Sequence, residues 1–208
     1  MEDVLQTYMR PYDPEHPVIC FDEACKQLFG VVRPPQAAGP GRPARVDYEY
    51  ERKGVCHQLL LCEPLRGWRH VQVTERHTRC DYARCMRDLV DVHYPQARKI
   101  RLVQDNLNTH DGTSLYEALP PEEARRILDR LEFHYTPKHG SWLNMAETEI
   151  NVMNRQCLDR RLESRERLAQ EVAAWERDRN ARQVRVHWTF TLVAARQKLR
   201  KLYPSIED

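Results

Sequence analysis

Three acidic residues, far apart in the sequence, lie next to segments that predict buried secondary structure. Asp22 follows the apolar run VICF, Asp105 follows IRLVQ, and Glu147 lies near the start of a predicted helix in SWLNMAE. Carboxylates on adjacent elements can hold two divalent cations about 4 Å apart, which neutralise a phosphate and activate a nucleophile. Mg²⁺ prefers such oxygen ligands over nitrogen or sulphur. The sequence therefore predicts metal-dependent chemistry on phosphodiesters.

The three carboxylates are not equally well defined by the pattern. Asp22 and Asp105 are singled out by position, because a charge beside a buried run is costly unless it caps, pairs or binds a cation. Glu147 follows Asn144 by three residues, which also matches a helix-capping pattern. Glu149 flanks the same apolar helix stripe from the other side. The pattern alone leaves Glu147 and Glu149 as rival ligands.

The elements that must position these residues alternate between strands and helices. Pro and Gly mark residues 33–45 as an exposed basic loop, and Thr78 with Asp81 forms a capping pair. Apolar patterning predicts strands over 18–21, 46–64, 68–75, 99–105 and 131–137. It predicts helices over 78–93, 115–119, 122–131, 145–157, 165–181 and 190–202. This order is typical of an α/β fold, whose ligand sites gather at the carboxyl ends of strands.

Composition describes an ordinary protein of 208 residues, 41% apolar and 31% charged, with room for one domain and perhaps a small appendage. No stretch approaches the roughly 18 apolar residues of a membrane helix, so we expect a cytoplasmic protein. Net charge is only +2, but residues 151–202 carry 13 Lys or Arg against six Asp or Glu. A local basic surface suits a nucleic-acid partner, although charge alone does not decide it.

The seven cysteines include no CxxC pair, so free thiols in a reducing compartment are the favoured interpretation. The less favoured alternative is a zinc cluster, although the spacing fits no common finger. Its ligands would be His70, His77, Cys80 and Cys85.

Three blocks of sequence resemble one family. DNLNTH at 105–110, HYTPKHGSWLNMAETE at 134–149 and GRPARVDYEY at 41–50 are similar to the DDE catalytic, or endonuclease, domain of bacterial insertion-sequence transposases in the Tc/mariner superfamily. The resemblance runs from about Val18 to Tyr203. It implies a ribonuclease H-like fold, with a central mixed five-stranded sheet, helices on both faces and a C-terminal helical extension. We expect a lead-in or linker over 1–17, the catalytic domain over 18–160 and the extension over 161–208.

The resemblance also assigns roles. It implies that Asp22, Asp105 and Glu147, rather than Glu149, are catalytic and bind two Mg²⁺ ions, with Mn²⁺ as a substitute. It implies cleavage at transposon ends and attack of a freed 3′-hydroxyl on target DNA, and hence a role in DNA transposition, recombination and integration. It also implies that the protein acts as a homodimer or larger assembly on DNA, near the bacterial nucleoid. Polar and aromatic residues near the site are candidate DNA contacts. They are Lys26, Arg42, Arg45, Asn106, His110, Lys138, His139 and Trp142.

The sequence departs from the family pattern in three ways. Relatives often carry Lys directly after Asp-Glu, whereas here Lys26 comes two positions later. We therefore expect an altered DNA or substrate contact near the site. Asp105 and Glu147 are 42 positions apart, which is long for the superfamily and which we attribute to the segment around Pro120 and Pro121. Residues 1–17 cannot hold the helix-turn-helix region that reads transposon ends, so we expect a separately encoded or missing half.

Two other functions stay open from the sequence. One is a truncated, non-catalytic transposase fragment that binds DNA or inhibits complete copies. The other is a host ribonuclease H-like nuclease that acts on an RNA–DNA hybrid or a DNA junction. The presence of all three acids argues against catalytic decay, but it does not exclude an inhibitory role.

Overall fold

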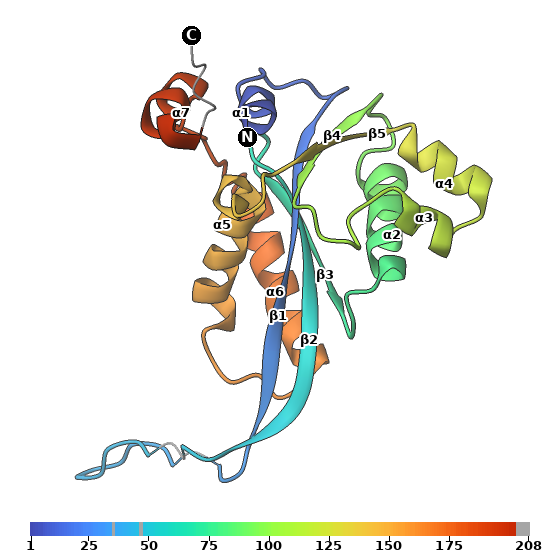
Figure 1. The fold of residues 1–208 in the computed structure, drawn as a ribbon. Coiled ribbons are helices and arrows are strands. Elements are labelled where there is room, and N and C mark those ends of the chain that lie inside the picture. The colour runs from blue at the N-terminus through green and yellow to red at the C-terminus, as the bar shows by residue number, and fades with distance from the viewer. Residues whose placement is uncertain (35, 46–47, 203–208) are drawn as a thin grey trace.

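A mixed five-stranded sheet forms the centre of the computed structural model, which describes residues 1–34, 36–45 and 48–202. The strands are β1 (Val18–Val31), β2 (Tyr50–Glu63), β3 (Trp68–Thr74), β4 (Ile100–Gln104) and β5 (Leu131–Tyr135). Their order across the sheet is β3-β2-β1-β4-β5 (Figure 1). The first three strands are antiparallel, whereas β4 and β5 run parallel to β1. The predicted mixed sheet is confirmed.

Strand β1 is much longer than the sequence predicted. We expected it to end at Phe21, but its ladder with β2 continues to Val31. The polar residues beyond the apolar run stay in the strand because β2 satisfies their backbone hydrogen bonds. Asp22 therefore lies inside β1, opposite Leu60, and not at a strand end as we expected.

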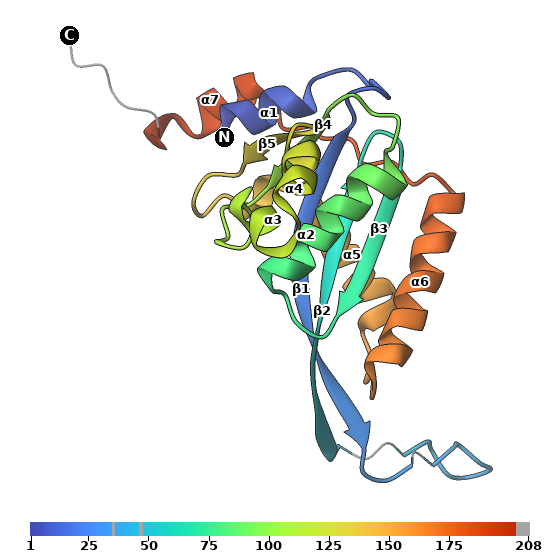
Figure 2. The ribbon, with the colours of Figure 1, turned by 90° about the vertical axis from the view of Figure 1, so that its right-hand side faces the viewer.

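The outer halves of β1 and β2 leave the body of the molecule as a two-stranded arm (Figures 1 and 2). At its tip, isolated bridges join Gln36 to Arg45 and Gly39 to Arg42. Both arginines are exposed, as predicted for a basic loop. Gly41 has a φ of +72°, a conformation that glycine adopts without strain. Parts of the predicted loop and of the strand after it, residues 35, 46 and 47, lie outside the described residues.

Helices cover both faces of the sheet (Figure 2). One face packs against α2 (Arg79–Asp88), its π-helical continuation η1 (Leu89–His93), α3 (Thr113–Ala118) and α4 (Pro121–Leu128). The other packs against α5 (Met145–Met153), the π-helical turn η3 (Asn154–Leu158) and α6 (Arg165–Ala181). The 3₁₀ turn η2 (Ser141–Leu143) precedes α5. The capping box of Thr78 and Asp81 is present, and the helix break before Pro121 is where we predicted it.

The N-terminal segment, expected to be a lead-in or linker, packs against the rest of the chain. Helix α1 (Glu2–Tyr8) buries Val4 and Leu5 completely in the core that α5 and α6 also line. It lies beside α7 (Leu192–Lys198) (Figure 2), where Arg196 binds Glu2. Helices α6 and α7 and the 3₁₀ turn η4 (Arg200–Leu202) fall within the range 161–208, where we expect a C-terminal extension. Residues 203–208 lie outside the described part. No helix within that part is both long and apolar enough to cross a membrane.

A buried ion triad fixes α5 and α6 to the edge strand β3. Glu149 of α5 accepts hydrogen bonds from Arg69 Nε at 3.1 Å and from Arg179 Nη2 at 2.9 and 3.1 Å. Glu149 is only 1% exposed. Asn180 also forms two hydrogen bonds with the backbone of Arg69, at 2.7 and 2.9 Å. The edge of β3 is thereby covered by α6, and a second chain cannot pair with it there.

Glu149→Ala is expected to destabilise the fold by about 3–5 kcal/mol, because it leaves two arginines buried without a counter-charge. Urea unfolding followed by circular dichroism measures the loss. Asp129→Ala, which breaks the exposed pair with Arg125, serves as the control and should change stability by about 0.5 kcal/mol or less. Equal effects of the two substitutions would contradict the structural role of the triad.

Candidate active site

The sheet register brings the two candidate aspartates to the same level. Cys20 of β1 pairs with Val103 of β4, and Asp22 and Asp105 each lie two residues further along their parallel strands. Asp105 directly follows β4, as predicted. Glu147 lies in the first turn of α5, the helix that packs against β1. The fold therefore converges the three carboxylates from three different elements.

The acids around Asp22 affect its ionisation. Burial has the largest effect and, with the negative charges of Glu23, Asp105 and Glu147, raises the pKa of Asp22 to about 7. The Glu23 backbone amide opposes this rise, and its effect exceeds that of any one of these charges. That amide donates a hydrogen bond to Asp22 Oδ1 at 2.9 Å. The site thus concentrates negative charge that a bound cation would relieve.

The donor set fits a hard divalent cation, because all three candidates offer carboxylate oxygens. In the described part of the chain, Asp22 and Asp105 each have one oxygen, Oδ1, in a hydrogen bond, and no protein hydrogen bond reaches Oδ2. The carboxylates are not already gathered as a cage. Among the described residues, no three His, Cys, Asp or Glu side chains are close enough together to hold a metal ion.

His110 links Asp105 to β1. Its Nδ1 lies 2.5 Å from Asp105 Oδ1, and its Nε2 lies 2.7 Å from Glu23 Oε2. The second contact is an ion pair without hydrogen-bond alignment, since that oxygen has no hydrogen-bond partner. Burial opposes the charged ring, but the contacts with both carboxylates outweigh it and raise the pKa of His110 to about 9. In turn, His110 and the Leu107 amide overcome burial and hold the pKa of Asp105 below its usual value.

The position of His110 does not support the DNA contact that we predicted for it. The side chain is only 3% exposed and packs edge-on against Phe21 and face-on against Tyr82. Both ring nitrogens are directed at carboxylates of the protein. His110 therefore holds Asp105 in place instead of presenting a nitrogen to a phosphate.

Asn144 links α5 to β1. Its Oδ1 accepts a hydrogen bond from the Ala146 amide at 3.1 Å, and its Nδ2 donates to the Phe21 carbonyl at 2.7 Å. The predicted N-cap is therefore present. The bond to Phe21, next to Asp22, could not be expected from the sequence, because a cap needs only the acceptor.

The two rival glutamates of α5 have different surroundings. Glu149 is buried against Arg69 and Arg179, which neutralise it. Glu147 is half-buried and faces the charge of Asp22. These surroundings agree with Glu147 as the ligand, and its assignment stays a prediction.

The remaining candidates fall into two groups. Asp105, Asn106, Lys138 and His139 line one cavity of about 410 Å³, which neither Asp22 nor Glu147 lines. Trp142 next to it is 47% exposed and contacts Phe190 edge-on. Lys26 lies apart from this cavity, and its Nζ donates to the Leu158 carbonyl at 2.7 Å. Arg42 and Arg45 lie at the tip of the arm. The fold thus brings only part of the predicted DNA-contact set close to Asp105.

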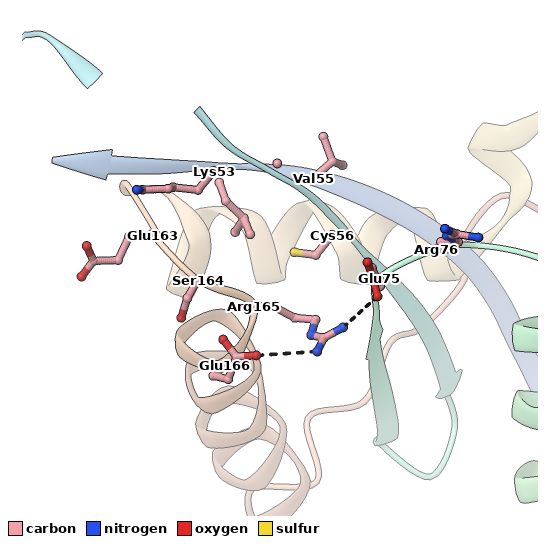
Figure 3. Close-up of a pocket in the computed structure, with 11 residues that line it drawn as sticks. Lys53, Val55, Cys56, Glu75, Arg76, Glu163, Ser164, Arg165 and Glu166 are labelled. Carbon is pink, nitrogen blue, oxygen red and sulfur yellow. Dashed lines mark ion pairs between the residues drawn. The ribbon is translucent and has the colours of Figure 1, made fainter. Parts of the chain in front are cut away.

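A larger cavity of about 610 Å³ lies between the base of the arm and the start of α6 (Figure 3). None of the three candidate carboxylates lines it. Its three acidic and three basic side chains balance in charge, and Arg165 there pairs with Glu75 and Glu166. It therefore offers no net attraction for a nucleic-acid backbone.

The structure gives no support to the zinc alternative. His70 contacts Glu176, the His77 ring lies tilted against His57 at 4.3 Å, and Cys85 is a buried residue of α2. No metal-binding group of three such side chains occurs among the described residues.

The mixed sheet places Asp22 within β1 and Asp105 directly after the adjacent parallel strand β4. The chain belongs to the DDE superfamily endonucleases, whose family model matches residues 17–169. That range contains all three candidate carboxylates, and membership implies dependence on a divalent metal. The predicted family is confirmed at this level, whereas a bacterial source stays a prediction.

The chain is also similar to solved structures of the Mos1 transposase. The Mos1 mariner paired end complex with Mn has 15% sequence identity and a TM-score of 0.58, over 87% of this chain and 55% of that chain. The Mos1 Strand Transfer Complex has 16% identity and a TM-score of 0.54, over 87% and 54%. At such identities the likeness shows the fold, and it confirms the predicted ribonuclease H-like architecture. The chain spans about half the length of these proteins. No curated protein matches the sequence.

His110→Ala is expected to destabilise the fold by about 2–4 kcal/mol, because it leaves Asp105 and the partly buried Glu23 without their shared cation. Chemical unfolding at neutral pH, where the ring is charged, measures the loss. His187→Ala removes an exposed histidine and should cost about 0.5 kcal/mol or less. If His110→Ala were as mild as this control, His110 would not hold the site together.

Proposed function

We propose that this chain is the catalytic domain of a DDE transposase, which cuts DNA strands and transfers the freed 3′ ends to target DNA. The observation that carries the proposal is the convergence of Asp22, Asp105 and Glu147 in a chain of the DDE endonuclease family. Further support comes from the similar Mos1 structures, which are paired-end and strand-transfer complexes.

In this proposal Asp22, Asp105 and Glu147 hold two Mg²⁺ ions, for which Mn²⁺ can substitute. When bound, the ions neutralise charge on the phosphate and lower the pKa of the attacking water. The protein supplies the positions of the ligands. His110 fixes Oδ1 of Asp105 and leaves Oδ2 for the cation. The backbone amide of Glu23 does the same for Asp22.

The DNA partner in this proposal contacts two surfaces. Lys138 and His139 beside Asp105, with the exposed ring of Trp142, would contact the strand at the site. Arg42 and Arg45 on the arm would contact phosphates further away. Phosphate contacts position DNA without reading its sequence, so recognition of transposon ends needs another, helix-turn-helix half. A second copy of the chain would complete the assembly.

Asp105→Ala is expected to reduce Mg²⁺-dependent nicking of plasmid DNA by roughly 10³-fold, as for the loss of several kcal/mol of transition-state stabilisation. DNA binding in a gel-shift assay should persist. Glu122→Ala, on an exposed face of α4, is the matched control and should cut like the unaltered chain. Undiminished nicking by Asp105→Ala would refute the assignment. An unaltered chain that binds DNA but never cuts, with Mg²⁺ or Mn²⁺, would favour the non-catalytic fragment.

Mn²⁺ at about 100 times its Kd is expected to raise the Tm of the unaltered chain by roughly 5–10 °C, the effect of about 2.7 kcal/mol on a domain of this size. Asp22→Asn should remove most of this shift, because it takes away a ligand. Without metal, this variant should be at least as stable as the unaltered chain, because one crowded negative charge is gone. Thermal scans at pH 8 and constant ionic strength measure both effects. An equal Mn²⁺ shift in Asp22→Asn would count against Asp22 as a ligand.

A further inference from the structure

One buried side chain joins the backbone beside two of the three candidate ligands. Asn144 Nδ2 donates to the carbonyl of Phe21, which directly precedes Asp22, at 2.7 Å. Asn144 Oδ1 accepts from the amide of Ala146, which directly precedes Glu147, at 3.1 Å. The side chain is 0% exposed, so water does not compete for either bond.

Helix capping explains only half of this arrangement. A cap needs an acceptor near the first helical amides, and Ser, Thr and Asp supply one as well as Asn. Elsewhere in this chain Ser164 caps α6 and Thr191 caps α7 with a hydroxyl. A hydroxyl can also accept and donate, but its single oxygen serves both roles. The longer amide of Asn144 accepts from α5 through Oδ1 and donates to β1 through Nδ2. The donor bond, and not the cap, fixes the helix start against the strand.

The turn around Asn144 is also held from the other side. The hydroxyl of Tyr8 donates to the Leu143 carbonyl at 2.9 Å and accepts from the Met145 amide at 3.4 Å. Tyr8 belongs to α1, and its ring packs against Trp188 at 5.3 Å. The residues on both sides of Asn144 are therefore fixed to the core, and the bridge to Phe21 lies in a rigid frame.

We propose that Asn144 is a positioning residue that sets the separation of Asp22 from Glu147, and hence the affinity of the site for a divalent cation. This rests on the proposed function, because it takes both residues as ligands of one metal site. Tyr8 supports the same geometry through the backbone of the turn. Loss of the bridge to Phe21 lets the start of α5 move relative to β1, and the cation then has to draw the ligands together.

Asn144→Ser separates the bridge from the cap. The serine hydroxyl keeps an acceptor for α5, as Ser164 does for α6, but it is too short to reach Phe21. Mn²⁺ binding to the DNA-free chain, followed by the electron paramagnetic resonance signal of the free ion, should show a Kd weakened at least tenfold. Nicking should slow at low Mn²⁺ and recover as Mn²⁺ is raised.

Ser164→Ala is the matched control, because it removes a cap far from the carboxylates. It should lower the Tm by about 2–4 °C and leave the Mn²⁺ Kd unchanged. Tyr8→Phe, which removes one hydroxyl and keeps the ring, should weaken the Kd about threefold, and it replaces Asn144→Ser if that variant does not fold.

Two outcomes distinguish failure of the proposed function from failure of the proposed role of Asn144. An unaltered chain that neither binds Mn²⁺ nor nicks DNA would overturn the proposed function, and the role of Asn144 with it. If Asp22→Asn abolishes Mn²⁺ binding while the folded bridge variants bind like the unaltered chain, the proposed function stands. Asn144 is then only a helix cap.

Discussion

The site depends on one constraint: it brings acids from three different elements near one another, and their negative charges add to burial in raising the pKa of Asp22. Phe21 and Glu23 of β1, which flank Asp22, each provide one link to another ligand-bearing element. Phe21 binds Asn144 of the α5 start, Asp22 is a candidate ligand, and Glu23 contacts His110, which also holds Asp105. Three consecutive residues thus connect all three ligand-bearing elements.

The links through His110 and Asn144 differ in charge. His110 is a cation between two carboxylates, so it offsets part of their repulsion as well as fixing positions. Its raised pKa keeps it charged near neutral pH. Asn144 is neutral and bonds only to backbone groups, so it fixes distance without changing charge. The protein therefore supplies a cation next to Asp105, whereas burial and the neighbouring acids raise the pKa of Asp22.

The features that could be predicted from the sequence are those that residues close together in the chain determine, such as strand ends, helix caps and helix bounds. The run IRLVQ before Asp105 indicated a strand ending at a ligand, and β4 ends there. The cap at Thr78 and the bounds of α6 follow from local capping and periodicity. The full length of β1 depends on pairing with β2, which no residue of β1 encodes alone. Likewise, α1 joins the core only because a groove for Val4 and Leu5 exists in the folded domain.

The choice between Glu147 and Glu149 shows why part of the site could not be derived from the pattern. A helical wheel places them on opposite sides of one apolar stripe, but it does not say what each side meets. That depends on α6, which brings Arg179 to Glu149, and on β3, which brings Arg69. An acid that the fold supplies with its own cations is structural. Glu147, whose charge acts on Asp22, has no such cation among the described residues, and we therefore keep it as the proposed ligand.

The links of β1 also explain how the site can be organised without being a closed cage. Asn144 holds the peptide groups before Asp22 and Glu147, and not their carboxylates. The backbone before both residues is thereby held, whereas the carboxylate of Asp22 is held only through Oδ1, by the Glu23 amide. Among the described residues, Oδ2 of Asp22 has no hydrogen bond. Cation affinity then depends on two quantities, the backbone separation set by Asn144 and the rotamer entropy lost when the carboxylates close on the ion.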